Sequence, residues 1–256
     1  MAEEKFQPIS VKPPSSNPLL FRLRCWVDLQ LGTIATHLKP QMAQLCGRIL
    51  DVGAGESPWR EWLPTNCCYQ GIDVENAQDY GMSLDKPNVA YFDGVKIPFE
   101  DATFDGAICI EVLEHAADPQ GLLSEIARVL KEGAPLLMTV PWSARRHHIP
   151  HDYHRFTRER LEQLFHMNGF GQIEIRERGN DVGVIANKMI VLTIRLLRPE
   201  HWKEAAWSIP LALPMGFIAV TMLCAAHISL YLARGSLEDP LGYFARGVRK
   251  SKAVDL

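Results

Sequence analysis

The residues with the clearest chemical meaning are Gly53 and Gly55, which follow an apolar run, and Asp73, which lies near the end of a second apolar run. Glycine lets the backbone approach a ligand where a Cβ would clash, and a carboxylate at the next strand end can accept hydrogen bonds from both ribose hydroxyls. Gly53 and Asp73 are 20 positions apart, and this spacing predicts a nucleoside-binding pocket. A plain strand-to-helix turn would explain the glycines, but it would not require the acid.

A second candidate site is the histidine-rich segment at 145–156, which reads RRHHIPHDYHRF. Histidine titrates near neutral pH, so His147, His148, His151 and Asp152 are candidates for a general base. Of these we expect His151 and Asp152 to be catalytic. Several possible metal ligands lie close together, but no spacing such as H-E-x-x-H is present, and we expect no metal.

The same segment also has a purely structural interpretation. Asp152 could pair with Arg155 and hold the loop, while Tyr153 and Phe156 pack into the core.

Composition narrows the class of protein. The chain has 256 residues, of which 47% are hydrophobic and 22% charged, with a net charge of -3. These values indicate a globular protein and do not favour a nucleic-acid partner. The six cysteines form no C-x-x-C pair and the first residues contain no apolar signal core, so we expect a reduced, cytoplasmic protein.

Strands and helices should alternate along most of the chain. Apolar runs predict seven strands, at 48–52, 68–74, 89–93, 104–110, 135–140, 172–176 and 241–249. Helical periodicity predicts helices at 18–37, 39–46, 119–131 and 157–167. This alternation predicts an α/β fold with a doubly wound, Rossmann-like, mostly parallel sheet, whose ligand lies beyond the carboxyl ends of the strands.

Four regions follow from this pattern. We expect a mobile tail at 1–17, a core with N-terminal helices at 18–181, a hydrophobic helical insertion at 182–235, and the closing strand with a C-terminal tail at 236–256.

The insertion is unusual because residues 205–233 contain no Asp, Glu, Lys or Arg. The run is long enough to cross a bilayer, but Pro210 and Pro214 should interrupt its helix, and a single crossing would separate the last strand from its sheet. We expect a helical pair that rests on a membrane face or forms a homodimer interface. A hydrophobic lid over the sheet is the alternative.

Five motifs occur in the order of a known family: ILDVGAG at 49–55, GIDV at 71–74, FDGVKIPFEDATFD at 92–105, CIEVLEH at 109–115 and LLSEIARVLKEGAPLLMTVP at 122–141. The chain resembles class I S-adenosylmethionine-dependent methyltransferases of the small-molecule subgroup. It departs from the family at Ser57, where a third glycine is common.

The resemblance implies S-adenosyl-L-methionine as cofactor and eight residues around it: Asp51, Gly53, Ala54, Gly55, Asp73, Asp93, Gly94 and Glu111. The glycine turn would enclose the methionine and ribose, and the segment at 93–94 would lie by the adenine. Asp51 and Glu111 would lie near the amino group, although Glu111 could also be a solvated strand-end residue. Glu114 and His115 are given no chemical role.

The expected function is methyl transfer to a small-molecule acceptor or to one linked to a lipid or saccharide. The alternative is a binding module that keeps the fold and the cofactor but transfers nothing. An RNA acceptor is disfavoured by the near-neutral charge. Peripheral membrane contact through 182–235 would place the protein at the inner face of the membrane.

Overall fold

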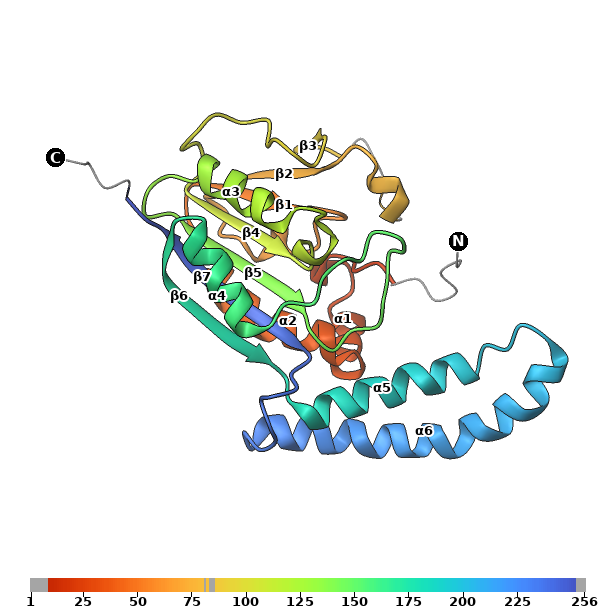
Figure 1. Ribbon diagram of the computed structural model, residues 1–256. Coiled ribbons are helices and arrows are strands. Elements are labelled where there is room, and N and C mark those ends of the chain that lie inside the picture. The colour runs from red at the N-terminus through yellow and green to blue at the C-terminus, as the bar shows by residue number, and fades with distance from the viewer. Residues whose placement is uncertain (1–8, 81, 83–85, 252–256) are drawn as a thin grey trace.

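The computed structural model describes residues 9–80, 82 and 86–251, and its centre is a seven-stranded sheet (Figure 1). The strand order is β3-β2-β1-β4-β5-β7-β6. The strands are β1 (Arg48–Val52), β2 (Cys68–Val74), β3 (Val89–Phe92), β4 (Gly106–Ile110), β5 (Pro135–Pro141), β6 (Phe170–Arg178) and β7 (Gly242–Arg249). Only β7 is antiparallel to its neighbours, β5 and β6. The predicted doubly wound, mostly parallel sheet is confirmed.

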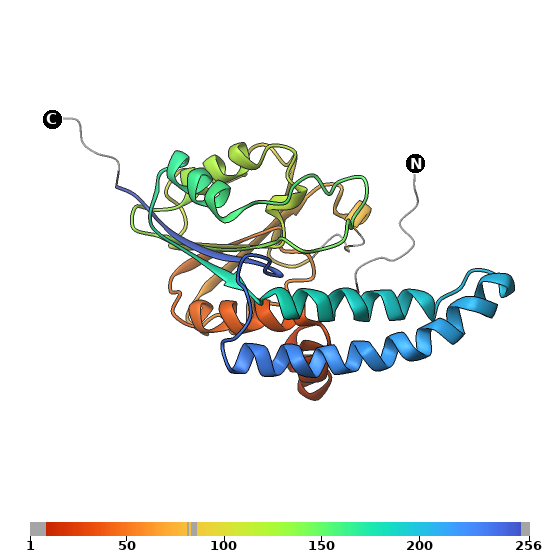
Figure 2. The same cartoon turned by 60° about the horizontal axis from the view of Figure 1, so that its bottom comes forward.

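Helices cover both faces of the sheet (Figure 2). Helices α3 (Pro119–Val129) and α4 (Arg158–Met167) pack on one face, and α2 (Leu29–Met42) packs on the other. The central strands are buried on both sides, which explains why β4 and β5 are almost continuous apolar runs. The two layers leave the carboxyl ends of the parallel strands as the open edge of the domain.

The N-terminal helices differ from the prediction of a helix at 18–37 followed by another at 39–46. Helix α1 (Pro18–Val27) ends at Asp28, and α2 begins at the next residue. The Asp28 carboxylate accepts a hydrogen bond from the backbone N–H of Leu31 at 3.2 Å, so it caps α2 at its N-terminus. Because α2 then continues through Pro40 to Met42, the second predicted helix is not separate.

The segment predicted as a mobile tail is fixed to the domain in its second half. The Ser15 backbone N–H donates to Glu61 at 2.8 Å, and Arg24 donates to the carbonyl groups of Ile9 and Ser10 at 2.6 Å. Residues 1–8 lie outside the described part of the chain.

The hydrophobic insertion is a helical hairpin between β6 and β7, as expected. Helix α5 (Asp181–Leu196) and helix α6 (Trp202–Tyr231) lie antiparallel and extend past the sheet on the side where the parallel strands end (Figure 1). The predicted break at Pro210 and Pro214 is wrong. Each proline removes a single backbone hydrogen bond, and α6 curves instead of ending (Figure 1).

Candidate active site

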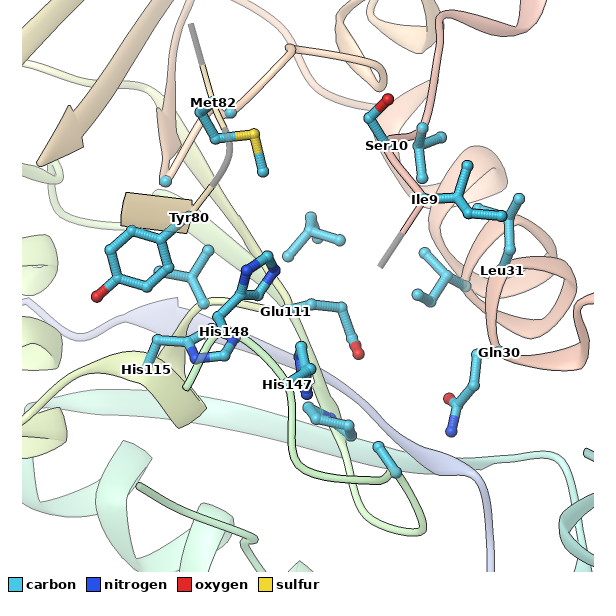
Figure 3. A pocket seen from close by; sticks show the side chains of 18 of the residues that line it. Ile9, Ser10, Gln30, Leu31, Tyr80, Met82, Glu111, His115, His147 and His148 are labelled. Carbon is cyan, nitrogen blue, oxygen red and sulfur yellow. The ribbon is translucent and has the colours of Figure 1, made fainter. Parts of the chain in front are cut away.

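A large open cleft lies at the carboxyl ends of the strands, where the chain order reverses between β1 and β4. This switch point is where α/β sheets bind ligands. One side of the cleft is formed by the loops after β1, β2, β4 and β5, and the other side by α1 and α5. Figure 3 shows side chains from both sides converging on the open space.

The glycine turn after β1 contacts Asp73, the acid near the end of β2. Gly53 and Gly55 have positive φ angles of 67° and 51°, and a Cβ on Gly53 would lie 2.4 Å from the side chain of Val112. The Gly55 N–H donates to the Asp73 carboxylate at 2.9 Å, and the Ala54 N–H donates to the Ile72 carbonyl at 3.0 Å. The structure therefore brings together the turn and the acid that the sequence spacing linked.

Asp73 lines the cleft together with the turn. Its second oxygen accepts from the Val74 N–H at 2.8 Å. Burial raises the pKa of Asp73, while the hydrogen bonds from Gly55 and Val74 oppose that shift. Each carboxylate oxygen keeps a further lone pair for a ligand hydroxyl.

Asp51 does not line the cleft, contrary to its expected contact with the cofactor. It is buried in the sheet, and its carboxylate accepts from the Tyr69 hydroxyl at 2.8 Å. The same hydroxyl lies 2.9 Å from the Ser57 Oγ. Burial raises the pKa of Asp51 to about 7. Asp51 thus supports the glycine turn from behind, through the hydroxyl groups of Tyr69 and Ser57, and no sequence pattern indicated this role for them.

Glu111 lines the cleft at the end of β4, where it has a positive φ of 55°. Its Oε1 lies 2.8 Å from Nη2 of Arg178, a fully buried residue at the end of β6. Glu111 is therefore an ion-paired residue and not a solvated strand end. Arg178 was missed because it lies 67 residues further along the chain.

Asp93 and Gly94 lie on the cleft rim after β3. Asp93 is exposed, and one of its oxygens accepts from the backbone N–H groups of Val95 at 2.8 Å and Lys96 at 3.0 Å. These hydrogen bonds lower the pKa of Asp93, so it is a charged carboxylate beside the cleft.

The predicted catalytic pair does not face the cleft. Asp152 is buried and binds Arg155 through both oxygens, at 2.6 and 2.8 Å. The His151 ring lies 3.1 Å from the Tyr153 hydroxyl and has its centroid 5.3 Å from that of Tyr80. Both tyrosines line the cleft, whereas His151 lies behind them. Asp152 thus pairs with Arg155 and holds the loop, as the structural interpretation of this segment expected. Phe156 is buried as that alternative expected, but Tyr153 is exposed.

The loop instead turns His147 and His148 toward the cleft. His115 and Tyr80 join them there, with Tyr80 5.7 Å from His148 and His115 4.8 Å from His147 between ring centroids (Figure 3). The sequence pointed weakly to His115 as a site residue, because His115 ends the motif CIEVLEH at 109–115. Tyr80 carried none.

The opposite wall of the cleft has many apolar side chains, together with the charged side chains of Arg24, Lys188 and Arg195. Leu20, Leu23 and Val27 of α1 and Ile190 and Ile194 of α5 contribute to it. The cleft therefore has a polar side formed by the strand ends and a hydrophobic side formed by helices outside the sheet.

This chain resembles proteins known as methyltransferases. A family model described as a methyltransferase domain matches residues 50–138. The O-methyltransferase rstn1 of Aspergillus nomiae is 30% identical over 160 residues, which are 55% of this chain and 71% of that protein. The sterol 24-C-methyltransferase erg6 of Schizosaccharomyces pombe is 40% identical over 96 residues, which are 34% of this chain and 25% of that protein.

The fold is also found among solved structures. An S-adenosylmethionine-dependent methyltransferase from Archaeoglobus fulgidus superposes with a TM-score of 0.53 at 17% identity, covering 91% of this chain and 99% of that one.

The chain belongs to the class I S-adenosylmethionine-dependent methyltransferases. It spans less than half the length of several curated O-methyltransferases that it matches.

Proposed function

We propose that this chain transfers a methyl group from S-adenosylmethionine to a small-molecule acceptor, or to one linked to a lipid or saccharide. The observation that carries the proposal is the contact between the Gly55 N–H and the Asp73 carboxylate at the switch point of the sheet. Family membership supports the reaction type.

The chemistry of the cleft fits this cofactor. S-adenosylmethionine carries an ammonium and a sulfonium, and it has no pyrophosphate. The cleft correspondingly presents the carboxylates of Asp73, Asp93 and Glu111, which favour cationic and hydroxyl-bearing ligands. Gly55 keeps a side chain out of the turn, where an added Cβ would lie in contact with Met82 at 3.4 Å. Asp73 would hold the ribose, Asp93 and Gly94 the adenine side, and Glu111 the amino group.

When bound, S-adenosylmethionine supplies a methyl group activated by its sulfonium. The chain's own part is to hold an acceptor in line and to exclude water. Tyr80, His147 and His148 border the acceptor side. For an acceptor that must lose a proton, His148 replaces His151 and Asp152 as the candidate base, because it faces the cleft.

The acceptor is proposed to be apolar over part of its length. The hydrophobic wall formed by α1 and α5 supports this, since it adjoins the polar side on which transfer would occur. A relative named for a sterol substrate is compatible with it.

We also propose that the α5–α6 hairpin rests on a membrane. The side of α6 that faces α5 carries small buried residues, including Ser208, Ala212, Ala219 and Ala226. Its outer side is apolar as well, and Trp207 and Phe217 are 57% and 78% exposed. A hairpin in water would have a polar outer face.

Helix α1 extends the same apolar surface. Its Leu19, Leu20 and Leu23 are exposed, and Trp26 stacks on His227 of α6 with ring centroids 5.1 Å apart. The same hairpin carries the exposed basic residue Lys203, and Lys188 and Arg195 lie exposed at the wall of the cleft. Basic side chains suit an anionic lipid surface.

The proposed contact is interfacial. By length and composition α6 could cross a membrane, but the hairpin begins at β6 and ends at β7, which pair with each other. Both ends must therefore lie on one side of the bilayer. We place the protein in the cytoplasm at the inner face of the membrane, with a homodimer through this surface as the alternative outcome.

The alternative function is a cofactor-binding module without transfer activity, because neither residue expected to be catalytic reaches the cleft. Calorimetry with S-adenosylmethionine, followed by transfer of labelled methyl into lipid, polysaccharide and small-molecule fractions, separates the two. We expect binding and label in the lipid fraction. Binding with no label in any fraction would favour the module.

A further inference from the structure

Glu114, His115, His147 and His148 meet at the carboxyl ends of β4 and β5. Glu114 and His115 belong to the short helix η4 (Leu113–His115), and the other two follow β5 in the loop. One ring nitrogen from each of the three histidines lies within 4.8 Å of the other two. Figure 3 shows the three rings grouped at the side of the cleft.

Hydrogen bonds at the outer edge of two rings decide which nitrogen faces inward. Nδ1 of His115 lies 2.7 Å from the carbonyl oxygen of His151, and Nδ1 of His147 lies 3.1 Å from that of Arg145. A carbonyl oxygen can only accept, so Nδ1 carries the hydrogen and Nε2 presents a lone pair in each neutral ring. Metal-binding histidines are usually oriented in this way.

Glu114 supplies a carboxylate to the same point. It is fully buried, and neither of its oxygens has a hydrogen-bond partner among the described residues. Its Oε1 lies 3.6 Å from Nε2 of His115 and 4.0 Å from Nε2 of His147. Both distances are too long for hydrogen bonds. They are close to the separation of about 3.4 Å between two ligands of a tetrahedral zinc ion.

Glu114 Oε1 and the Nε2 atoms of His115 and His147 are thus three acceptors close to one another, and no described residue donates a hydrogen bond to Glu114. Burying a carboxylate without a hydrogen-bond donor is costly, even where a cation such as Arg155 attracts it from a distance. A proton on Glu114 could serve only one imidazole at a time, whereas a cation would satisfy all three groups at once.

We propose that Glu114, His115 and His147 bind one divalent transition-metal ion of the zinc type, with His148 beside it. Two histidines and a glutamate with one open position form a ligand set of catalytic zinc sites. The open position would face the cleft, where it could hold a hydroxyl or carboxyl oxygen of the acceptor.

Asp152 gains a role in this arrangement. The His147 backbone N–H donates to Asp152 at 3.0 Å, and Arg155 holds Asp152 in place. Asp152 is therefore a positioning residue for His147.

The test is cobalt binding, which needs neither S-adenosylmethionine nor an acceptor. Untagged protein is stripped with a chelator and titrated with Co²⁺ while its visible absorption and metal content are followed. We expect one equivalent per chain with a tetrahedral absorption spectrum. Glu114→Gln and His147→Ala should each weaken Co²⁺ binding by at least about tenfold.

His151→Ala is the matched control, because it removes a nearby imidazole outside the cluster and keeps the carbonyl that orients His115. It should bind Co²⁺ like the wild type, and circular dichroism establishes that each variant is folded. Absence of a visible spectrum, or equal affinity in wild type and folded Glu114→Gln, would overturn the proposal. So would a thiolate charge-transfer band, which would place the ion on cysteines. Higher thermal stability of Glu114→Gln in metal-free protein, with no Co²⁺ bound by the wild type, would identify a protonated carboxyl instead.

Discussion

Arg178 reaches from the end of β6 to Glu111 at the end of β4, and its Nη2 lies 2.8 Å from Glu111 Oε1. Strands β5 and β7 lie between the two. Along its path the guanidinium also donates to the carbonyl groups of Val140 at 3.1 Å and Tyr243 at 3.2 Å. The buried cation thereby joins β6 to β7, β5 and the end of β4 behind the cleft, and it fixes a carboxylate that faces the cleft.

Replacing Arg178 with Met should destabilise the fold by about 3–5 kcal/mol, because it leaves Glu111 and several carbonyl groups without their donor. Urea unfolding measures the loss. Arg176→Met, at an exposed position of the same strand, should change stability by less than about 0.5 kcal/mol. Adding Glu111→Gln to Arg178→Met should restore part of the loss, and strict additivity of the two changes would contradict the pairing.

The sheet was predictable from the sequence because parallel strands buried on both faces are continuous apolar runs. All seven predicted strands exist, although their bounds differ by up to two residues. The nucleoside-binding edge was predictable for a related reason. Gly53 and Gly55 follow β1, and Asp73 lies near the end of β2. Successive strands in an alternating strand–helix pattern pair in parallel, so their carboxyl ends lie at one edge of the sheet.

The catalytic side was less predictable because its residues come from separate loops. His151 and Asp152 were expected to be catalytic because of their residue types, but the path of the loop directs His147 and His148 into the cleft. Glu114, Arg178 and Tyr69 act through contacts between distant segments. No periodicity or short motif encodes such contacts.

Tyr69→Phe should destabilise the protein by about 1–3 kcal/mol, because it removes the hydroxyl that donates to the buried Asp51 carboxylate. Tyr91→Phe is the matched control, since that hydroxyl is buried without a hydrogen-bond partner among the described residues. Thermal melting compares the two, and an equal effect of both changes would argue against a specific Tyr69–Asp51 bond.

Asp51 should make stability depend on pH. Burial raises its pKa from 3.8 to about 7, so folding favours the protonated form. That contribution is fully present below about pH 4 and is lost as the pH rises through about 7. Asp51→Asn cannot titrate, so its stability relative to wild type should rise by up to about 4 kcal/mol between about pH 4 and about pH 8. Urea unfolding at several pH values measures the difference. A difference that does not change with pH for Asp51→Asn would mean that Asp51 is not buried as described.

The outer face of α6 should carry membrane binding. Trp207→Gln together with Phe217→Gln should weaken binding to anionic vesicles by at least about tenfold, because a large apolar side chain contributes about 1.5–3 kcal/mol when it leaves water. Met167→Gln removes an exposed apolar side chain from α4 and should leave vesicle binding unchanged. Vesicle flotation measures the effect, and analytical ultracentrifugation reports the oligomeric state. A wild-type protein that ignores vesicles and forms dimers through α6 would contradict the membrane proposal.

Calorimetric binding of S-adenosylmethionine to wild type and to Asp73→Ala tests the central claim most directly. The account predicts that the wild type binds one cofactor per chain. The variant should bind it more weakly by about 1–3 kcal/mol, or roughly 5- to 150-fold in Kd, because a ribose contact is lost. Asp239→Ala should bind like the wild type, and a thermal melt establishes that Asp73→Ala is folded. A folded Asp73→Ala protein with an unchanged Kd would contradict the assignment of the cofactor to this cleft.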